Sequence, residues 1–500
     1  MINPPEPVPD LDWSPERARA LGDAALEMYE EWLRRLPDLP VYREGKATEV
    51  SEAVHLDVPA EGMRDQDLLD YLRKLVFDYS MYPGHPGFLA YIVGGGTVPG
   101  AISDLVAAGI NQNVGGWRLS PGATEIELHL VRFFADRFGL PDEAGGMVVS
   151  GGSVANFIGL KAARDAKGGA DVRAAGLTGG PQLVAYTSAE VHFATTRAAD
   201  MIGIGTNNIR LIGVDDHYRM EVAELESRIE KDLAAGLRPF CIVASLGTVA
   251  TGAIDPLEPI ADLCARHGLW MHVDAAYGGP IVLAEDLREL ATGVERADSI
   301  AFDPHKWLYT PQSGGCILVR DVAHLAESFS ADAGYVYEDK ELTGRGIDLG
   351  MLGPQLSRSF WALKVWVSLL AHGTEAYGRR ISHDVALTRY LADRIEASDR
   401  FELAAPVGLS ICCFRYVPPD LDDGEGREEY LDLLNERIMA AVQMDGRVYY
   451  SNAILGDRFV LRTCIVNFRT EAEHLDRVLE VTEELGAKLD SELRPDALRR

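Results

Sequence analysis

The sequence predicts an α/β protein with a mostly parallel central sheet, an N-terminal helical segment and a small C-terminal α/β domain. Three patterns lead to this prediction. Between His85 and about Ala371, apolar strand-like runs alternate with helical patterns, which is typical of a parallel sheet crossed by helices. Residues up to about Tyr82 form helical patterns joined by loops, and the tail from about Tyr377 combines a long helix with strand-like runs. We therefore expect three parts, which comprise residues 1–84, 85–376 and 377–500.

Local signals place elements within each part. Ser14-Pro15-Glu16 offers a helix N-cap followed by proline at the first helical position. In the central part, Thr124 and Glu127 match a capping box, which predicts the start of a helix, and Met147 to Val149 is strand-like. The tail contributes two strand-like runs around a helix, LSICCFRYV (409–417) and FVLRTCIVNF (459–468).

Composition limits the classes of partner. The chain has 500 residues, 47% of them hydrophobic, which is enough for more than one domain core. A net charge of −29 argues against nucleic acid or an anionic membrane as a partner. The six cysteines form no CxxC pair, and there is neither a signal peptide nor an apolar span long enough to cross a bilayer. We expect a cytoplasmic protein with reduced thiols and no metal site.

Lys306 is the first candidate for chemistry. The chain has only nine lysines against 39 arginines, and this one follows an apolar strand in SIAFDPHKWLYTP (299–311). An ammonium group in apolar surroundings costs free energy unless it is paired or neutralised, for example through an imine bond. Lys306 is therefore a candidate Schiff-base lysine. The alternative is a lysine at a strand end that reaches out to solvent.

Asp274 is the second candidate. The run LWMHVDAAYGG (269–279) indicates a buried parallel strand that places Asp274 at its carboxyl end, where open α/β sheets bind their ligands. A buried carboxylate needs a donor or a cation, and a protonated pyridine nitrogen is one such partner. The alternative is an aspartate that caps the next turn. An acid at the end of one strand, followed by a lysine at the end of the next, is a more specific signal than either residue alone.

A glycine-rich turn lies upstream of this pair. Strand-like Met147 to Val149 leads into Ser150-Gly151-Gly152-Ser153 and then into a helical pattern. Such a turn presents backbone N–H groups and the positive end of a helix, which suit a phosphate. Many strand-turn-helix junctions bind nothing, and this one lacks the signature of a P-loop.

The motifs HVDAAYGG, DPHKW and HPGFLAY, met in one chain, resemble the group II pyridoxal 5'-phosphate (PLP)-dependent amino acid decarboxylases, the family that includes aromatic-L-amino-acid decarboxylase. The resemblance runs from about Leu36 to about Arg469. It implies the fold-type I PLP-dependent transferase fold, PLP as cofactor and an amino acid as substrate. It further implies release of CO2 and an amine, and a homodimer whose N-terminal arm embraces the partner subunit.

The resemblance also implies roles for individual residues. Lys306 matches the lysine that binds the cofactor, and Asp274 matches the partner of its pyridinium nitrogen. His192 matches the histidine that stacks on the cofactor ring, and Ala276 the small residue on the other face. Without the family, His192 would be interpreted as an ordinary core histidine.

Further positions match cofactor contacts. Gly152 and Ser153 fall on the phosphate-binding turn, with His305 and Asp303 beside the lysine, and Thr248 falls near cofactor and substrate. Asp303 departs from the family pattern, because the aromatic enzymes commonly carry Asn there. This departure adds a negative charge on the phosphate side.

Tyr335, in SADAGYVYEDK (330–340), matches the tyrosine of the mobile catalytic loop. After CO2 leaves, Cα must gain a proton, and a phenol on a closing loop can donate it. Tyr337 is a near neighbour in the same loop, and an ordinary loop aromatic is the alternative for both.

Two other departures bear on the substrate. Trp361 stands where the aromatic enzymes often have a basic residue, although Arg358 is present three residues earlier. The segment Ile92 to Gly96 replaces an aromatic stretch of the substrate pocket and offers no counter-ion for an acidic side chain. We predict decarboxylation of an aromatic L-amino acid. The alternatives are an aldehyde synthase, a decarboxylase of branched aliphatic amino acids such as valine, or a non-catalytic homologue.

Overall fold

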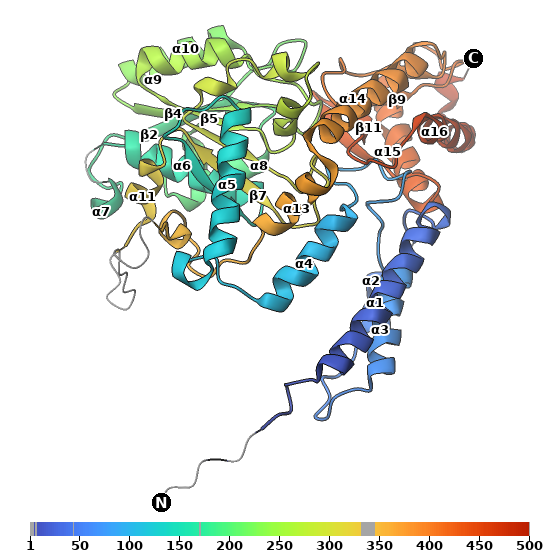
Figure 1. Cartoon of the computed structure of the whole chain (residues 1–500). Helices are drawn as coiled ribbons and strands as arrows, with labels where there is room; N and C mark the ends of the chain where they lie inside the picture. Colours follow the sequence, from blue (N-terminus) through green and yellow to red (C-terminus); the bar gives the residue numbers. More distant parts are fainter. Residues whose placement is uncertain (1–4, 6–7, 44, 170–171, 332–345, 500) are drawn as a thin grey trace, which may run out of the picture.

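The computed structural model describes residues 5, 8–43, 45–169, 172–331 and 346–499 (Figure 1). Its central feature is a seven-stranded sheet of order β1-β7-β6-β5-β4-β2-β3. Only β7 runs antiparallel to its neighbours, so the predicted mostly parallel sheet is confirmed. The strands are β1 (Gly145–Val149), β2 (Leu183–Ser188), β3 (Ile209–Ile212), β4 (Arg238–Ser245), β5 (Trp270–Asp274), β6 (Ser299–Phe302) and β7 (Gly315–Val319).

Helices cover both faces of this sheet. The connections from β1 to β2 to β3 run along the sheet in one direction, and those from β3 to β4 to β5 run in the other. Because such crossovers are right-handed, the first pair of helices, α6 and α8, and the second pair, α9 and α10, lie on opposite faces. Within each pair the helices contact each other. Their bounds are α6 (Gly152–Lys167), α8 (Phe193–Met201), α9 (Val222–Ala234) and α10 (Leu257–His267).

The register of the parallel strands fixes where the site forms. Asp274 at the end of β5 is paired with Ser245 at the end of β4 and with Ala301 near the end of β6. The three carboxyl ends therefore meet at one edge. Lys306 lies in the loop just after β6 rather than on the strand itself, but at the same edge.

The capping-box prediction at Thr124 and Glu127 is wrong. Helix α5 (Pro121–Arg137) begins one turn earlier, because Pro121 occupies the first position and has no N–H to satisfy. Glu127 is instead fully buried inside the helix, where it accepts a hydrogen bond from Val148 N at 2.8 Å and pairs with Arg358. The remaining helices around this sheet are α4 (Val98–Ile110), α7 (Val172–Ala175), α11 (Ala323–Phe329) and α13 (Ala362–His372).

The C-terminal part has its own antiparallel sheet of order β10-β11-β9-β8 and its own hydrophobic core. The predicted long helix and both predicted strands are present. The boundaries proposed at residues 84 and 376 stay a prediction. The elements are α14 (Thr374–Glu396), β8 (Phe401–Leu403), β9 (Ile411–Tyr416), α15 (Arg427–Asp445), β10 (Ser451–Leu455), β11 (Arg458–Cys464) and α16 (Ala472–Leu493).

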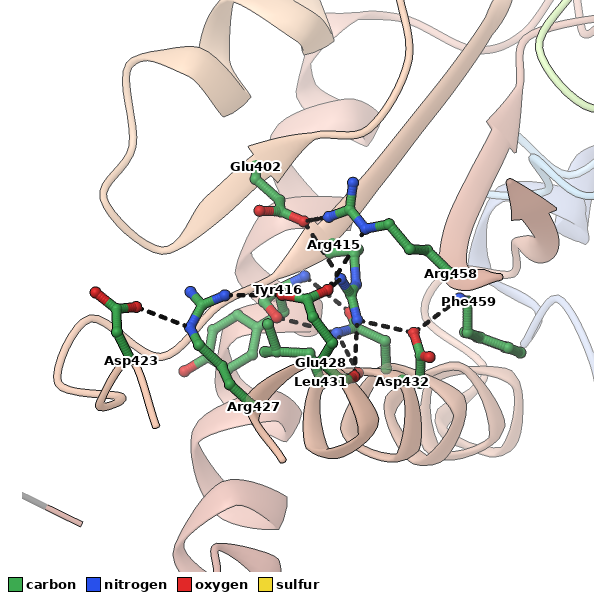
Figure 2. Close-up of polar contacts among 11 residues, drawn as sticks. Glu402, Arg415, Tyr416, Asp423, Arg427, Glu428, Leu431, Asp432, Arg458 and Phe459 are labelled. Carbon is green, nitrogen blue, oxygen red and sulfur yellow. Dashed lines mark hydrogen bonds and ion pairs between the residues drawn. The ribbon is translucent and has the colours of Figure 1, made fainter. Parts of the chain in front are cut away.

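An ion-pair network fastens helix α15 to this sheet (Figure 2). The side chain of Arg415 on β9 is fully buried and points toward α15, where its Nη1 and Nη2 lie 2.8 Å from Glu428 and 2.8 Å from Asp432. Asp432 also accepts a hydrogen bond from Phe459 N on β11, at 2.8 Å. One buried guanidinium thus ties helix and sheet together.

The N-terminal helices are α1 (Pro15–Arg35), α2 (Ala47–Val54) and α3 (Asp65–Asp78), and they project away from the rest of the chain (Figure 1). The predicted start of α1 is confirmed, since Ser14 Oγ accepts a hydrogen bond from Arg17 N at 3.3 Å. No residue of α1 is buried. Among the described helices, none is long and apolar enough to cross a membrane.

Candidate functional site

A pocket of about 440 Å³ lies at the carboxyl edge of the large sheet. It is formed by the turn between β1 and α6, by the ends of β4 and β5, by the loop after β6 and by the segment before α8. Nine of the ten candidate residues line it, namely Gly152, Ser153, His192, Thr248, Asp274, Ala276, Asp303, His305 and Lys306. The tenth, Tyr335, lies outside the described residues, as does Tyr337.

Asp274 presents a buried carboxylate to this pocket. Its Oδ1 accepts a hydrogen bond from Ala276 N, and its Oδ2 accepts one from Asn156 Nδ2, both at 3.1 Å. Burial raises the pKa of Asp274, while the nearby Lys306 ammonium and the N–H of Ala276 oppose the rise. A carboxylate held in this way is a strong acceptor for one further N–H.

A chain of polar side chains fixes the orientation of Asn156. Its Oδ1 lies 2.7 Å from His272 Nε2, and His272 Nδ1 lies 2.7 Å from Ser299 Oγ. Burial lowers the pKa of His272 to about 3, so this ring is neutral. The Asp274 carboxylate only accepts, so the amide nitrogen of Asn156 faces it and Asn156 Oδ1 faces His272 Nε2. The proton of His272 therefore sits on Nε2, and Nδ1 accepts from the Ser299 hydroxyl, whose oxygen also accepts from Trp270 Nε1.

Lys306 forms an ion pair with Asp303. Its Nζ lies 2.9 Å from Asp303 Oδ2, and the backbone N–H of Lys306 donates to Asp303 O at 3.0 Å. Burial disfavours the ammonium, but the carboxylates of Asp303 and Asp274 outweigh this effect and raise the pKa of Lys306. The amine is charged in the cofactor-free protein.

The N-terminus of α6 faces the same pocket. The cap position is Gly151, and no side chain caps the helix with a hydrogen bond. Gly152 and Ser153 open the first turn and line the cavity. Free N–H groups and the positive end of the helix dipole form a suitable site for a phosphate.

His192 and Thr248 line the pocket from two further segments. His192 is the N-cap of α8, and its Nδ1 accepts the N–H of Ala194 at 3.2 Å. Burial lowers the pKa of His192, so the ring is neutral and can pack against an aromatic ligand. Thr248 Oγ1 is held by Ala253 N at 3.1 Å.

A second chamber of about 610 Å³ adjoins the pocket and shares Ile92, His192, Val249 and Lys306 with it. Its wall contains Arg462, a residue that the sequence analysis did not identify. Arg462 is 3% exposed, and its Nη2 has no hydrogen-bond partner within the described part of the chain. A buried guanidinium with a free N–H beside the cavity is suited to bind a carboxylate.

The glycine-rich segment after Ile92 packs against neighbouring backbone and does not open space in the chamber. A Cβ on Gly94 would collide with Val466 O, and a Cβ on Gly95 would lie 2.8 Å from Gly84 Cα. These glycines therefore permit close backbone packing. Of this segment, Ile92 alone lines the two cavities.

Comparison with known proteins accounts for this arrangement. Residues 48–417 match the family profile described as the pyridoxal-dependent decarboxylase conserved domain. The chain belongs to this family. As a pyridoxal-dependent decarboxylase it is a carboxy-lyase that uses PLP to act on an amino acid, and the predicted fold-type I fold is confirmed.

The relatives differ in the amino acids that their names indicate. The chain is 32% identical to an aromatic-L-amino-acid decarboxylase of Bacillus atrophaeus over 94% of this chain and 95% of the relative. It is 30% identical to the human acidic amino acid decarboxylase GADL1 over 88% of each chain. A solved structure of Oryza sativa TDC with PLP and tryptamine superposes with a TM-score of 0.89 at 27% identity, covering 96% of this chain and 99% of the other.

The residues present fit the cofactor. Asp274 offers an acceptor for a pyridinium N–H, the uncapped start of α6 offers donors for a phosphate, and Lys306 offers an amine for the aldehyde.

Proposed function

We propose that this protein decarboxylates an aromatic L-amino acid at the pocket that contains Lys306 and Asp274. The observation that carries the proposal is the adjoining 610 Å³ chamber, whose lining includes the apolar side chains of Ile92, Val191 and Phe193 and whose only arginine among the described lining residues is Arg462. The chamber is large enough for a bulky side chain. A valine side chain would leave most of it unfilled.

Each residue has a distinct part in the proposed reaction. The bound cofactor supplies an electron-accepting ring. Lys306 would hold the cofactor through its amine, Asp274 would accept the N–H of its ring nitrogen, and His192 would pack against its ring. Arg462 binds the α-carboxylate of the incoming amino acid. Tyr335 then donates the proton that replaces CO2 at Cα.

The carboxyl group of Glu190 in the 610 Å³ chamber argues against a substrate with an acidic side chain. Glu190 lines the same chamber as Arg462, and burial raises the pKa of its carboxyl group. A substrate with a second carboxylate would bring like charges together in a partly desolvated space. If Arg462 binds the α-carboxylate, the described lining residues provide no other arginine for a second carboxylate.

The test is to incubate the PLP-loaded protein with each of the twenty amino acids and with cysteine sulfinate, and to measure CO2 and amine. Tryptophan, tyrosine or phenylalanine should give the highest kcat/KM. Turnover of valine, or of aspartate and cysteine sulfinate, at a higher kcat/KM would contradict the proposed substrate class. Aldehyde and peroxide in place of amine would identify an aldehyde synthase.

The role of Lys306 has a separate test. Borohydride should fix PLP to Lys306 in the wild type, as mass spectrometry of the peptide would show, and the Lys306→Ala variant should retain no reducible adduct. The Lys161→Ala variant is a control, because Lys161 pairs with Asp165 on α6, away from the pocket lining. An adduct in Lys306→Ala at the wild-type level would contradict the assignment.

We further propose a homodimer. Helix α4 exposes a row of apolar side chains that nothing covers within the described chain, and α1 buries none of its residues. The exposed residues are Val98, Ile102, Leu105, Val106 and Ile110. A second copy that buries this face would remove the cost of exposing it. Light scattering should give twice the chain mass of 54.6 kDa, and an active monomer would contradict the proposal.

A cytoplasmic location is also proposed. All six cysteines are buried and free of disulfides, which suits a reducing compartment. Cell fractionation tests this location.

A further inference from the structure

The ion pair between Lys306 and Asp303 lies in the lining of the candidate site. The Asp303 side chain is 3% exposed, and its Oδ2 lies 2.9 Å from Lys306 Nζ. Both residues belong to one turn, because Lys306 N donates to Asp303 O. The turn therefore fixes the spacing of the two backbones that places the carboxylate beside the amine.

Packing further confines the carboxylate. A Cβ placed on Gly152 would approach Asp303 Oδ2 to 2.7 Å, so Asp303 lies directly against the first turn of α6. The positive end of that helix favours a negative charge at this position. His305 also approaches this carboxylate, with Nδ1 4.0 Å from Asp303 Oδ1. Oδ1 itself has no hydrogen-bond partner among the residues that the structure describes.

The chemistry of the side chain makes Asp303 a poor contact for a phosphate. An ionised carboxylate only accepts hydrogen bonds, and so does a phosphate dianion, so neither can donate to the other. Two buried like charges would also repel each other. Among the residues that the structure describes, Lys306 is the one lysine or arginine that forms an ion pair with Asp303.

We propose that Asp303 is a positioning residue that acts as the counter-ion of Lys306, holding its amine charged and in place until the cofactor arrives, rather than a contact to the cofactor phosphate. This proposal rests on the assignment of Lys306 as the lysine that binds PLP. Only a neutral amine can attack an aldehyde carbon. Asp303 therefore sets the pH at which Lys306 becomes reactive. Asp274, His192 and Cys464 also interact electrostatically with the amine, and of these Asp274 and then Cys464 add to the effect of Asp303.

The experiment measures the amine itself in the cofactor-free protein. Trace acetic anhydride labels neutral amines, and mass spectrometry of the Lys306 peptide gives the extent of labelling at each pH. In Asp303→Asn the midpoint should fall by about one pH unit, which corresponds to about tenfold more labelling at a fixed pH below both midpoints. The control variant is Asp165→Asn, which removes the carboxylate 2.6 Å from Lys161 and should leave the Lys306 profile unchanged.

Capture of pyridoxal, which lacks the phosphate, separates the two roles of Asp303. The amount fixed by borohydride in a short exposure near neutral pH should rise about tenfold in Asp303→Asn for both pyridoxal and PLP. A rise for PLP alone would overturn the proposal and make Asp303 a phosphate-side residue. An unchanged Lys306 profile would also overturn it, while normal fixation of PLP on wild-type Lys306 would leave the proposed function standing.

A measurement on the wild type keeps the proposal testable if Asp303→Asn does not fold. With its counter-ion in place, Lys306 should titrate at or above the ordinary lysine value of about 10.4. A labelling midpoint well below this value in the cofactor-free wild type would contradict the ion pair.

Discussion

The indole Nε1 of Trp307 donates a hydrogen bond to Asp384 Oδ2 at 2.9 Å, which ties the loop that carries Lys306 to helix α14. The hydroxyl of Tyr309 donates to the same oxygen at 2.5 Å, and Arg380 pairs with Oδ1. Asp384 is fully buried. Trp307 and Tyr309 both follow Lys306, so one carboxylate from the C-terminal part of the chain anchors the loop just after the lysine.

Replacing Asp384 by Ala should loosen the lysine loop. Two buried donors, on Trp307 and Tyr309, would lose their acceptor at a cost of about 1–3 kcal/mol each. We expect a lower free energy of unfolding and a PLP dissociation constant raised by roughly tenfold or more, measured by fluorescence titration. Asp393→Ala, at an exposed position on the same helix, is the control and should change neither quantity.

Arg462→Lys tests the proposed carboxylate site. Lysine keeps the charge but loses the fork of N–H groups that can bind a carboxylate through two hydrogen bonds. KM for the amino acid substrate should rise about tenfold to a hundredfold, consistent with 1.5–3 kcal/mol for hydrogen bonds to a charged group. The inhibition constant of the product amine should stay unchanged, because the amine has no carboxylate. An equal loss of affinity for both ligands would mean that Arg462 only shapes the chamber.

Those residues of the candidate site that lie at the ends of buried strands could be predicted from the sequence. Buried parallel strands appear in the sequence as apolar runs, and the residue that ends such a run lies at the ligand edge. This rule placed Asp274 at the end of β5, and it placed Lys306 at the same edge although it lies beyond β6. The turn before α6 was recognisable from its glycines.

Other residues could not be predicted because long-range contacts define them. Arg462 comes from the second sheet and reaches the chamber only through the packing of the two parts. Asn156 is one polar residue inside a helix, and its role depends on His272 and Asp274, which lie more than a hundred residues later. Glu127 matched a local capping motif, but burial against Val148 decided its role.

Arg415→Ala should strongly destabilise the C-terminal part. Its guanidinium is fully buried between β9 and α15, where Glu428 and Asp432 are bonded to it (Figure 2). Breaking a buried pair by removing one partner typically costs about 3–5 kcal/mol. Arg427→Ala is the matched control, because Arg427 pairs only with the exposed side chains of Asp423 and Glu428 among the described residues and should cost less than about 1 kcal/mol. Urea unfolding of the wild type and the two variants measures the free energy of unfolding that each substitution removes. Equal losses in the two variants would contradict the buried role of Arg415.

Asp255 should make stability depend on pH. Its carboxylate is buried and accepts hydrogen bonds from Met220 N and Ser245 N, both at 2.8 Å. Burial raises the pKa of Asp255 to about 6. In the unfolded chain the value is about 3.9, so between about pH 4 and 6 the folded protein keeps a proton that the unfolded chain has released. The group therefore stabilises the fold below about pH 4, and this contribution is lost as the pH rises through 6.

The variant Asp255→Asn isolates that contribution. The difference in free energy of unfolding, wild type minus variant, should fall by about 2–3 kcal/mol between about pH 4 and 6, at about 1.4 kcal/mol per pH unit. Above about pH 6 the difference should be constant. A difference that rises over this interval would show that the pKa of Asp255 is lowered rather than raised in the folded protein.

Tyr335 is predicted to decide what becomes of the substrate carbon after CO2 leaves. If its hydroxyl supplies the proton to Cα, Tyr335→Phe keeps the ring but removes that proton. The protonation step should slow by about 10²–10⁴-fold. Dioxygen should then oxidise the electron-rich carbon, so that aldehyde, ammonia and peroxide form at the expense of amine.

The measurement is the ratio of amine to aldehyde with and without oxygen. Tyr337→Phe, two residues along, is the control: an unchanged ratio in Tyr335→Phe would end this assignment, and a change confined to Tyr337→Phe would transfer the role to Tyr337.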